Sequence, residues 1–206
     1  MYLEAFSDNP YATNCWLVAA EGSLDAAVID PGFSPERVQA LLRAAGKRPV
    51  AVLVTHGHLD HIGAVADVCG TELPLYIHKE DELALGDHEA WGAGYSAPPI
   101  RPPEVRTVSD GEVIETAGLA LEVIHTPGHT PGSVCFRAPE LVFTGDLVFH
   151  GSIGRSDFPN SSQSAMARSL RRFLELPDEL RVYPGHNETT TVGTERATNP
   201  FLLQLA

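Results

Sequence analysis

The stretch Thr55-His56-Gly57-His58-Leu59-Asp60-His61 places three histidines and one carboxylate within six residues. It directly follows the apolar run Val50–Val54, which predicts a buried strand. Neutral imidazole nitrogens and carboxylate oxygens are the usual protein ligands of zinc and related divalent metals. His56 and His58 are two positions apart, so an extended backbone would point both rings to the same side. The pattern therefore predicts a metal site at the end of a buried strand.

The residues after this strand predict a helix. Asp60 and His61 would open it, and apolar positions such as Ile62 and Val65 would continue it as far as Gly70. A carboxylate in the first turn is favourable because the helix dipole is positive there. Solvent-exposed histidines are the alternative reading, but surface loops rarely collect this composition.

Three other strand ends repeat the same arrangement, a His or Asp in a glycine-containing turn after an apolar run. Each is weak evidence alone, because a single histidine after a strand is more often an ordinary loop residue. Together with the first motif, they predict one site assembled from several loops at strand ends. The candidate ligands at these three ends are His129, Asp146 and His186.

Composition is typical of a soluble globular protein, with 43% hydrophobic and 20% charged residues. The length of 206 residues predicts a single domain spanning 1–206. The net charge is −13, from 27 acidic and 14 basic residues, and no basic run is present. This charge argues against a nucleic-acid partner. Bound divalent cations would offset part of it.

The three cysteines, Cys15, Cys69 and Cys135, are far apart and show no Cys-x-x-Cys spacing. They are predicted to be small buried apolar residues in a reducing compartment. The first residues do not resemble a signal peptide, and no apolar run reaches the length of a membrane span. We therefore expect a cytoplasmic protein that does not act at a membrane. The sequence does not determine the oligomeric state.

Predicted strands outnumber predicted helices and alternate with them irregularly, which favours sheet layers flanked by helices. Two long segments have neither pattern, residues 86–103 and residues 147–163. Loops of this length often bind ligands. The second contains Arg155, which is a candidate for contacting a substrate carboxylate. An exposed ion pair with Asp157 is the alternative role for Arg155.

Taken together, these motifs make the chain resemble the metallo-β-lactamase-fold hydrolases. The resemblance is strongest to the short bacterial type-II glyoxalase-like (hydroxyacylglutathione hydrolase-like) group, and it covers nearly the whole chain. It implies an α/β (α+β) fold, an αββα sandwich of two mixed sheets with helices on the outer faces. Besides the histidine motif, the matching segments are Asn14-Cys15, Asp30-Pro31-Gly32, Gly154–Pro159, Glu195-Arg196 and Asn199-Pro200.

The resemblance also implies a dinuclear centre of two divalent metal ions, with zinc expected and iron or manganese compatible. In this family pattern one ligand bridges the two metals. The implied ligands are His56, His58 and His129 for the first metal, Asp60, His61 and His186 for the second, and Asp146 as the bridge.

The implied activity is hydrolysis of a small thioester of the S-lactoylglutathione type by a metal-bridging hydroxide. Asp60 would act in catalysis as well as in metal binding, by orienting the hydroxide and accepting its proton. Arg155 would bind the substrate. The C-terminal helical extension with which larger type-II glyoxalases bind glutathione is not expected here, because the sequence has no room for it.

Other reactions of the same fold remain open. A mononuclear iron persulfide dioxygenase would use His56, His129 and Asp146. A lactonase or another ester hydrolase of the same fold is the third possibility. A metal-binding scaffold without activity is the non-enzymatic alternative, but it would be expected to lose ligands, and none is lost. The segments Tyr183–His186 and Asn199–Phe201 favour the hydrolase.

Overall fold

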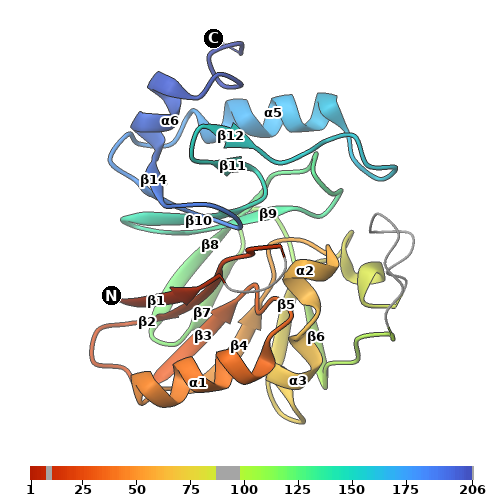
Figure 1. Ribbon diagram of the computed structural model, residues 1–206, viewed down its shortest axis with the longest axis vertical. Coiled ribbons are helices and arrows are strands. Elements are labelled where there is room, and N and C mark those ends of the chain that lie inside the picture. Colours follow the sequence, from red (N-terminus) through yellow and green to blue (C-terminus); the bar gives the residue numbers. More distant parts are fainter. Residues whose placement is uncertain (8–10, 87–97, 206) are drawn as a thin grey trace.

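The computed structural model describes residues 1–7, 11–86 and 98–205. Two six-stranded sheets lie face to face, and helices cover the outer face of each (Figure 1). The observed αββα sandwich of two mixed sheets confirms the predicted fold class.

The first sheet follows the order of the chain, from β1 to β6. Its first two pairings, β1 with β2 and β2 with β3, are antiparallel, and the other three are parallel. The ends of the parallel strands therefore meet at one edge, where the histidine motif follows β4. The strands are β1 (Tyr2–Phe6), β2 (Cys15–Ala19), β3 (Asp25–Ile29), β4 (Arg48–Leu53), β5 (Pro74–His78) and β6 (Glu104–Val108).

The second sheet has the order β14-β13-β10-β9-β8-β7, in which only β10 and β13 run parallel. A small hairpin of β11 (Val148–Phe149) and β12 (Ser152–Ile153) follows β10. The strands of the sheet are β7 (Val113–Thr116), β8 (Leu119–His125), β9 (Val134–Ala138), β10 (Leu141–Gly145), β13 (Arg181–Pro184) and β14 (Thr190–Thr191).

Helices α1 (Pro35–Ala45) and α3 (Val65–Cys69) cover the first sheet, and α5 (Gln163–Phe173) and α6 (Val192–Thr198) cover the second (Figure 1). The boundaries of α1 follow from its sequence. Pro35 stands in the first turn, where its missing N–H costs nothing. Gly46 ends the helix in the left-handed conformation, with φ of 61°.

The predicted helix from Asp60 to Gly70 was wrong in one respect. It is divided into α2 (Leu59–Ile62) and α3, with Gly63 and Ala64 between them. The N–H of Ala64 leaves the helical pattern because it donates to the carbonyl of Gly32 at 2.6 Å. Gly63 also lies against the Phe33 ring, where an added Cβ would come within 2.5 Å of a ring carbon.

Other segments also differ from the prediction or could not be compared with it. Strand β7 was not predicted, because it has four residues, of which one, Ile114, is buried, and so carries a short signal. The short hairpin of β11 and β12 lies in the segment 147–163, which was predicted to lack strands. The expected ligand-binding role of the segment 86–103 falls largely on residues 87–97, which lie outside the described part of the chain.

The main hydrophobic core fills the space between the two sheets and continues under α1 and α3, and a second one lies between the second sheet and α5. Between the sheets, the completely buried Phe143 of the second sheet lies against Trp16 of the first, with ring centroids 6.1 Å apart. Met166 and Phe173 of α5 fill the second core. Both sheets are thus fixed relative to one another by close packing, which holds their strand ends in place.

The three cysteines are buried and unpaired, as predicted. Burial raises the pKa of Cys69 and of Cys135 to about 12, so both thiols are protonated and behave as apolar groups. Among the described helices, none is long and apolar enough to cross a membrane.

Leu17→Ala is expected to lower the free energy of unfolding by about 2–5 kcal/mol, because Leu17 is 1% exposed and its loss leaves a cavity in the main core. Urea denaturation of the chelator-treated protein measures this change without a contribution from bound metal. Leu24→Ala is the matched control, since Leu24 is 71% exposed, and its effect should stay within about 0.5 kcal/mol. Equal losses in the two variants would contradict this assignment of the core.

Candidate metal centre

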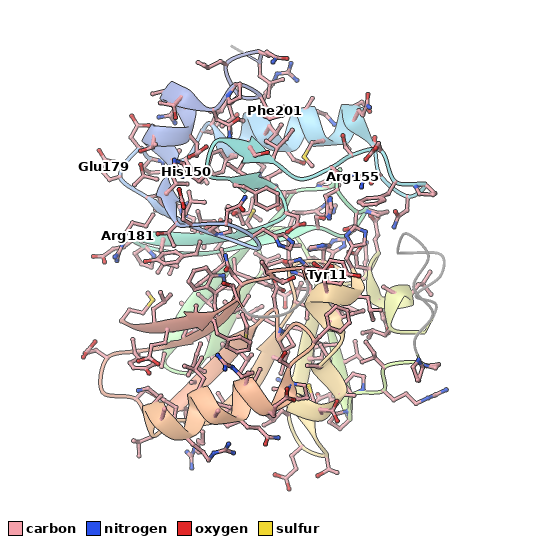
Figure 2. All side chains as sticks on the ribbon, viewed as in Figure 1. Tyr11, His150, Arg155, Glu179, Arg181 and Phe201 are labelled. Carbon is pink, nitrogen blue, oxygen red and sulfur yellow. The ribbon has the colours of Figure 1, made fainter. Side chains whose placement is uncertain are left out.

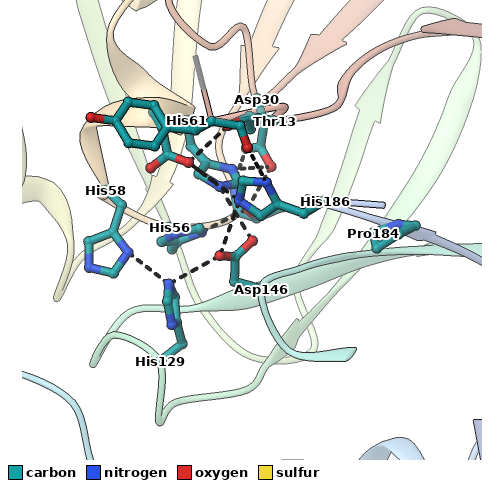
Figure 3. Close-up of polar contacts among 12 residues, drawn as sticks. Thr13, Asp30, His56, His58, His61, His129, Asp146, Pro184 and His186 are labelled. Carbon is teal, nitrogen blue, oxygen red and sulfur yellow. Dashed lines mark hydrogen bonds and ion pairs between the residues drawn. The ribbon is translucent and has the colours of Figure 1, made fainter. Parts of the chain in front are cut away.

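The structure brings all seven predicted ligands to one edge of the sandwich (Figure 3). They come from four chain segments of both sheets, each just after a strand, at the ends of β4, β8, β10 and β13. Within each of three overlapping groups the donor atoms lie within 4.8 Å of one another. These groups are His56, His58 and His129; His56, His61 and Asp146; and Asp60, His61 and His186.

The first group is a triangle of imidazole rings. His58 Nδ1 lies 2.7 Å from His129 Nε2, and the His56 ring centroid is 4.8 Å from that of His58 and 4.7 Å from that of His129. His129 Nε2 also lies 3.3 Å from a carboxylate oxygen of Asp146. The nitrogens converge on one point, as the ligands of a single cation do.

Asp60, His61 and His186, called the second group from here on, adjoin the first group at Asp146. His61 Nε2 lies 3.4 Å from Asp146 Oδ1 and 3.5 Å from Asp60 Oδ2. His186 Nε2 lies 3.5 Å from Asp146 Oδ2 and 3.4 Å from Asp60 Oδ2. Because the Asp146 carboxylate reaches both groups, it lies where the family resemblance implies a bridging ligand.

Hydrogen bonds on the outer nitrogens fix the orientation of three rings. His129 Nδ1 donates to the carbonyl of Arg155 at 2.7 Å, and His186 Nδ1 donates to the carbonyl of Tyr11 at 3.1 Å. His56 Nδ1 bonds the hydroxyl of Thr55 at 3.2 Å. A carbonyl only accepts, so the Nδ1 atoms of His129 and His186 carry the protons and their Nε2 atoms present lone pairs to the centre.

Several donor atoms of the centre are buried without a hydrogen-bond partner. Such atoms are rare in folded proteins, because an unpaired buried polar atom costs free energy. They include Nε2 of His56, Nε2 of His61 and Oδ1 of Asp146. Cations would satisfy all of them, and metal pairs of this kind lie about 3.5–4 Å apart. The residues therefore fit a dinuclear metal site.

The charge states of the donors differ between the two sides of the centre. Burial, together with the neighbouring His61, holds the pKa of His56 well below its usual value, so this ring is neutral. Burial alone would raise the pKa of Asp146, but His61 and His186 outweigh it and hold that pKa low. Burial opposes His61 and His186 at Asp60 as well, and its pKa falls to about 2. Although burial opposes it, the same carboxylates raise the pKa of His61 well above its usual value and that of His186 to about 9, so a metal that binds there displaces protons from these two rings.

Two residues that were not predicted as site residues hold the second group in place. Asp30, which is 1% exposed, accepts the Thr55 N–H at 2.8 Å and the Thr55 hydroxyl at 2.7 Å, and its Oδ2 pairs with His61 Nδ1 at 3.0 Å. Thr13 donates its hydroxyl to Asp60 Oδ2 at 2.9 Å. The Asp30-Pro31-Gly32 segment was recognised as a family feature, but its role depends on contacts between distant segments.

Asn14 and Gly154 belong to two other segments that match the family, and both residues help to position metal ligands. The Asn14 side-chain amide donates to the carbonyls of Pro184 and Asn187, at 3.0 and 2.8 Å, and so holds the turn that carries His186. A Cβ on Gly154 would lie 1.8 Å from the carbonyl oxygen of Asp146. The chain after β12 thus passes against the bridging residue, where no side chain fits.

A cavity of about 400 Å³ opens over the ligands, a volume within the usual range for small-molecule sites. Arg155 is at its rim and Tyr11 lines it near the level where the two layers meet (Figure 2). Arg155 makes the alternative contact considered above, a two-bond ion pair with Asp157 at 2.9 and 3.1 Å. Its guanidinium carbon also lies 4.5 Å above the centre of the Phe158 ring. The Arg155 side chain therefore faces both the cavity and the solvent.

The remaining described histidines lie outside the centre. His78 and His125 stack nearly parallel, with ring centroids 4.1 Å apart and an angle of 12°. An imidazole lone pair lies in the plane of its ring, so two stacked rings do not direct their lone pairs at one cation. His150 pairs with the exposed Glu188, and His88 lies outside the described residues.

His186→Ala is expected to lower the bound metal from two ions per chain to one, because it removes a donor from the second group only. Elemental analysis after dialysis measures the stoichiometry. The matched control is His150→Ala, which removes an exposed histidine outside all three groups and should leave two ions. Two ions retained in His186→Ala would argue against the dinuclear assignment.

Comparison with known proteins gives one consistent result. Among curated proteins, hydroxyacylglutathione hydrolase GloC of Haemophilus influenzae is 33% identical, over 98% of each chain. Among solved structures, the BLEG-1 B3 metallo-β-lactamase superposes with a TM-score of 0.89 at 31% identity, over 98% of this chain and 99% of that one. TTHA1623 in a di-iron-bound form has a TM-score of 0.81 at 42% identity, over 98% and 100%.

ETHE1 from Myxococcus xanthus is also similar, with a TM-score of 0.80 at 28% identity, over 99% of this chain and 85% of that one. The sequence profile of the metallo-beta-lactamase superfamily matches residues 8–186, a range that includes all seven ligand positions. On the fold, the ligand set and these similarities, the chain belongs to the metallo-β-lactamase superfamily of metal-dependent hydrolases.

Proposed function

We propose that this protein hydrolyses a small thioester of the S-lactoylglutathione type in the cytoplasm. The observation that carries the proposal is the position of Asp146 between two groups of metal donors, directly beneath an open cavity. When bound, a pair of divalent metals supplies a hydroxide at neutral pH and polarises the substrate carbonyl. The similarity to a hydroxyacylglutathione hydrolase along the whole chain supports the choice of substrate class.

The residues around the metals would place the reacting groups. Asp60 lines the cavity, and the hydroxyl of Thr13 holds its Oδ2 atom at 2.9 Å. From this position Asp60 would orient the attacking hydroxide and accept its proton. The carbonyls of Arg155 and Tyr11 keep the lone pairs of His129 and His186 on the centre throughout.

The departing group needs no separate acid. A thiol has a pKa of about 8.5, so a thiolate leaves far more readily than an amine would. Beyond the ligands themselves, the described residues that line the cavity offer the Tyr11 phenol and the Arg155 guanidinium but no carboxylic acid or imidazole. Such a site suits a thioester better than a substrate whose leaving group must be protonated.

A persulfide dioxygenase is the second candidate, and the similarity to ETHE1 is compatible with it. One specific observation favours it, the contact of 3.3 Å between His129 and Asp146, with the His56 ring adjacent to His129. Two histidines and a carboxylate are the ligand set of iron enzymes that activate oxygen. The second group, Asp60, His61 and His186, is the feature that this reaction would leave without a role.

Purified protein is expected to contain two metals per chain and to cleave S-lactoylglutathione without oxygen, because hydrolysis consumes only water. Metal analysis and an anaerobic assay of free thiol measure both properties. One iron per chain, with oxygen consumed in the presence of glutathione persulfide and no thioester cleavage, would instead establish the dioxygenase.

Arg155→Ala is expected to raise the KM for anionic thioesters more than for neutral ones, by several-fold, because the guanidinium is at the rim of the cavity. The substitution leaves intact the carbonyl that holds His129, so kcat should change little. Steady-state kinetics with a matched pair of charged and neutral substrates tests this. Equal shifts for both substrates would remove Arg155 from substrate binding.

A further inference from the structure

Asp81 is a buried carboxylate that belongs neither to the metal ligands nor to the lining of the cavity. It lies in the turn after β5 and is completely inaccessible to solvent. Its Oδ2 atom accepts the Gly57 N–H at 2.7 Å and the Thr130 hydroxyl at 2.6 Å. Its Oδ1 atom accepts the Gly132 N–H at 2.5 Å. Burying an ionisable carboxylate is costly unless its hydrogen bonds are made, so this arrangement is specific.

The partners of Asp81 lie in the two loops that supply the three-histidine group. Gly57 stands between His56 and His58 on the loop after β4, which belongs to the first sheet. Thr130 follows His129 on the loop between β8 and β9, which belong to the second sheet. One side chain thus joins the two sheets at the point where their histidines must converge.

The two loops approach Asp81 and its neighbours too closely for a side chain at position 57 or 132. A Cβ on Gly132 would lie 2.4 Å from Asp81 Oδ1, and a Cβ on Gly57 would lie 2.5 Å from the Cβ of Ala84. Glycine at both positions lets the loops close on the carboxylate. The close packing around Asp81 therefore explains why both positions are glycine, which the histidine motif alone does not explain.

Three of the other four ligands, all except Asp146, depend on different supports. Asp30 holds His61, Thr13 holds Asp60, and the carbonyl of Tyr11 holds His186. None of these contacts involves Asp81. The Asp81 side chain thus bonds the loops of the three histidines, whereas Asp30 bonds His61 directly and reaches His56 through Thr55.

We propose that Asp81 is a positioning residue that sets the spacing of the first metal site independently of the second. The inference rests on the proposed two-metal function. Partners that hold metal ligands in place typically change metal affinity by about 10–100-fold when they are removed. Loss of the Asp81 carboxylate should therefore release the metal held by His56, His58 and His129 and leave the other metal bound.

Asp81→Asn tests this because it keeps the size of the side chain but turns an NH₂ group toward donors. It is expected to bind the first metal at least about 10-fold more weakly, so that one ion remains after dialysis. Titration of the metal-free protein with Co²⁺ resolves the two sites by affinity and by absorption spectrum. Excess metal should restore the parental kcat, which a general loss of folding would not allow.

Two variants serve as comparisons. Asp110→Asn alters a carboxylate on the neighbouring turn that bonds the His125 N–H and Arg172, and it should bind both metals as the parent does. Thr130→Val removes a single bond to Asp81 and should weaken the first site by several-fold. It also provides a milder test if Asp81→Asn does not fold.

The outcomes separate the two proposals. Both metals bound to Asp81→Asn and Thr130→Val with parental affinity, or both weakened equally, would overturn the role of Asp81. A parent protein that binds two metals but cleaves no thioester would overturn the proposed function and leave the role of Asp81 standing.

Discussion

The structure depends on one constraint, the convergence of five histidines and two aspartates, four of them buried and three partly buried, on a common point. Nitrogens and oxygens such as His61 Nε2 and Asp146 Oδ1 have no hydrogen-bond partner there. Without cations, the free-energy cost of these unpaired atoms would be borne by the packing of the two sheets. Metal binding and folding are therefore coupled, and the surrounding hydrogen bonds serve to keep the donors in one arrangement.

The two sheets divide this task between them. The first sheet supplies His56, His58, Asp60 and His61 from one loop, whereas the second supplies its three ligands from three separate strand ends. The distances between the ligands therefore depend on how the two sheets are placed relative to one another. Buried groups that cross the gap, such as Asp81 and Asn14, therefore matter as much as the ligands, because they bond the loops rather than the strands.

The sequence predicted the architecture and brought together the right ligands because their signal is local. His56, His58, Asp60 and His61 share one motif, and each other ligand follows an apolar strand. The supports at Asp30 and Asp81 were not predicted as site residues, because their partners are 24 or more positions away and no spacing marks them. The division of the helix at Gly63 was missed for the same reason, since it depends on Phe33 and Gly32.

The chemistry of the centre and the choice of substrate are set by different parts of the chain. The donor groups around Asp146 fit the metal centre of a metal-dependent hydrolase, and they are fixed by buried contacts. The cavity wall is made instead by loop residues such as Tyr11, Arg155 and Phe158, of which Tyr11 is 38% exposed. Loops of this kind can change without disturbing the ligands. The metal centre therefore indicates the reaction class, whereas the residues at the rim of the cavity determine the substrate. At that rim, Arg155 both pairs with Asp157 and lines the cavity.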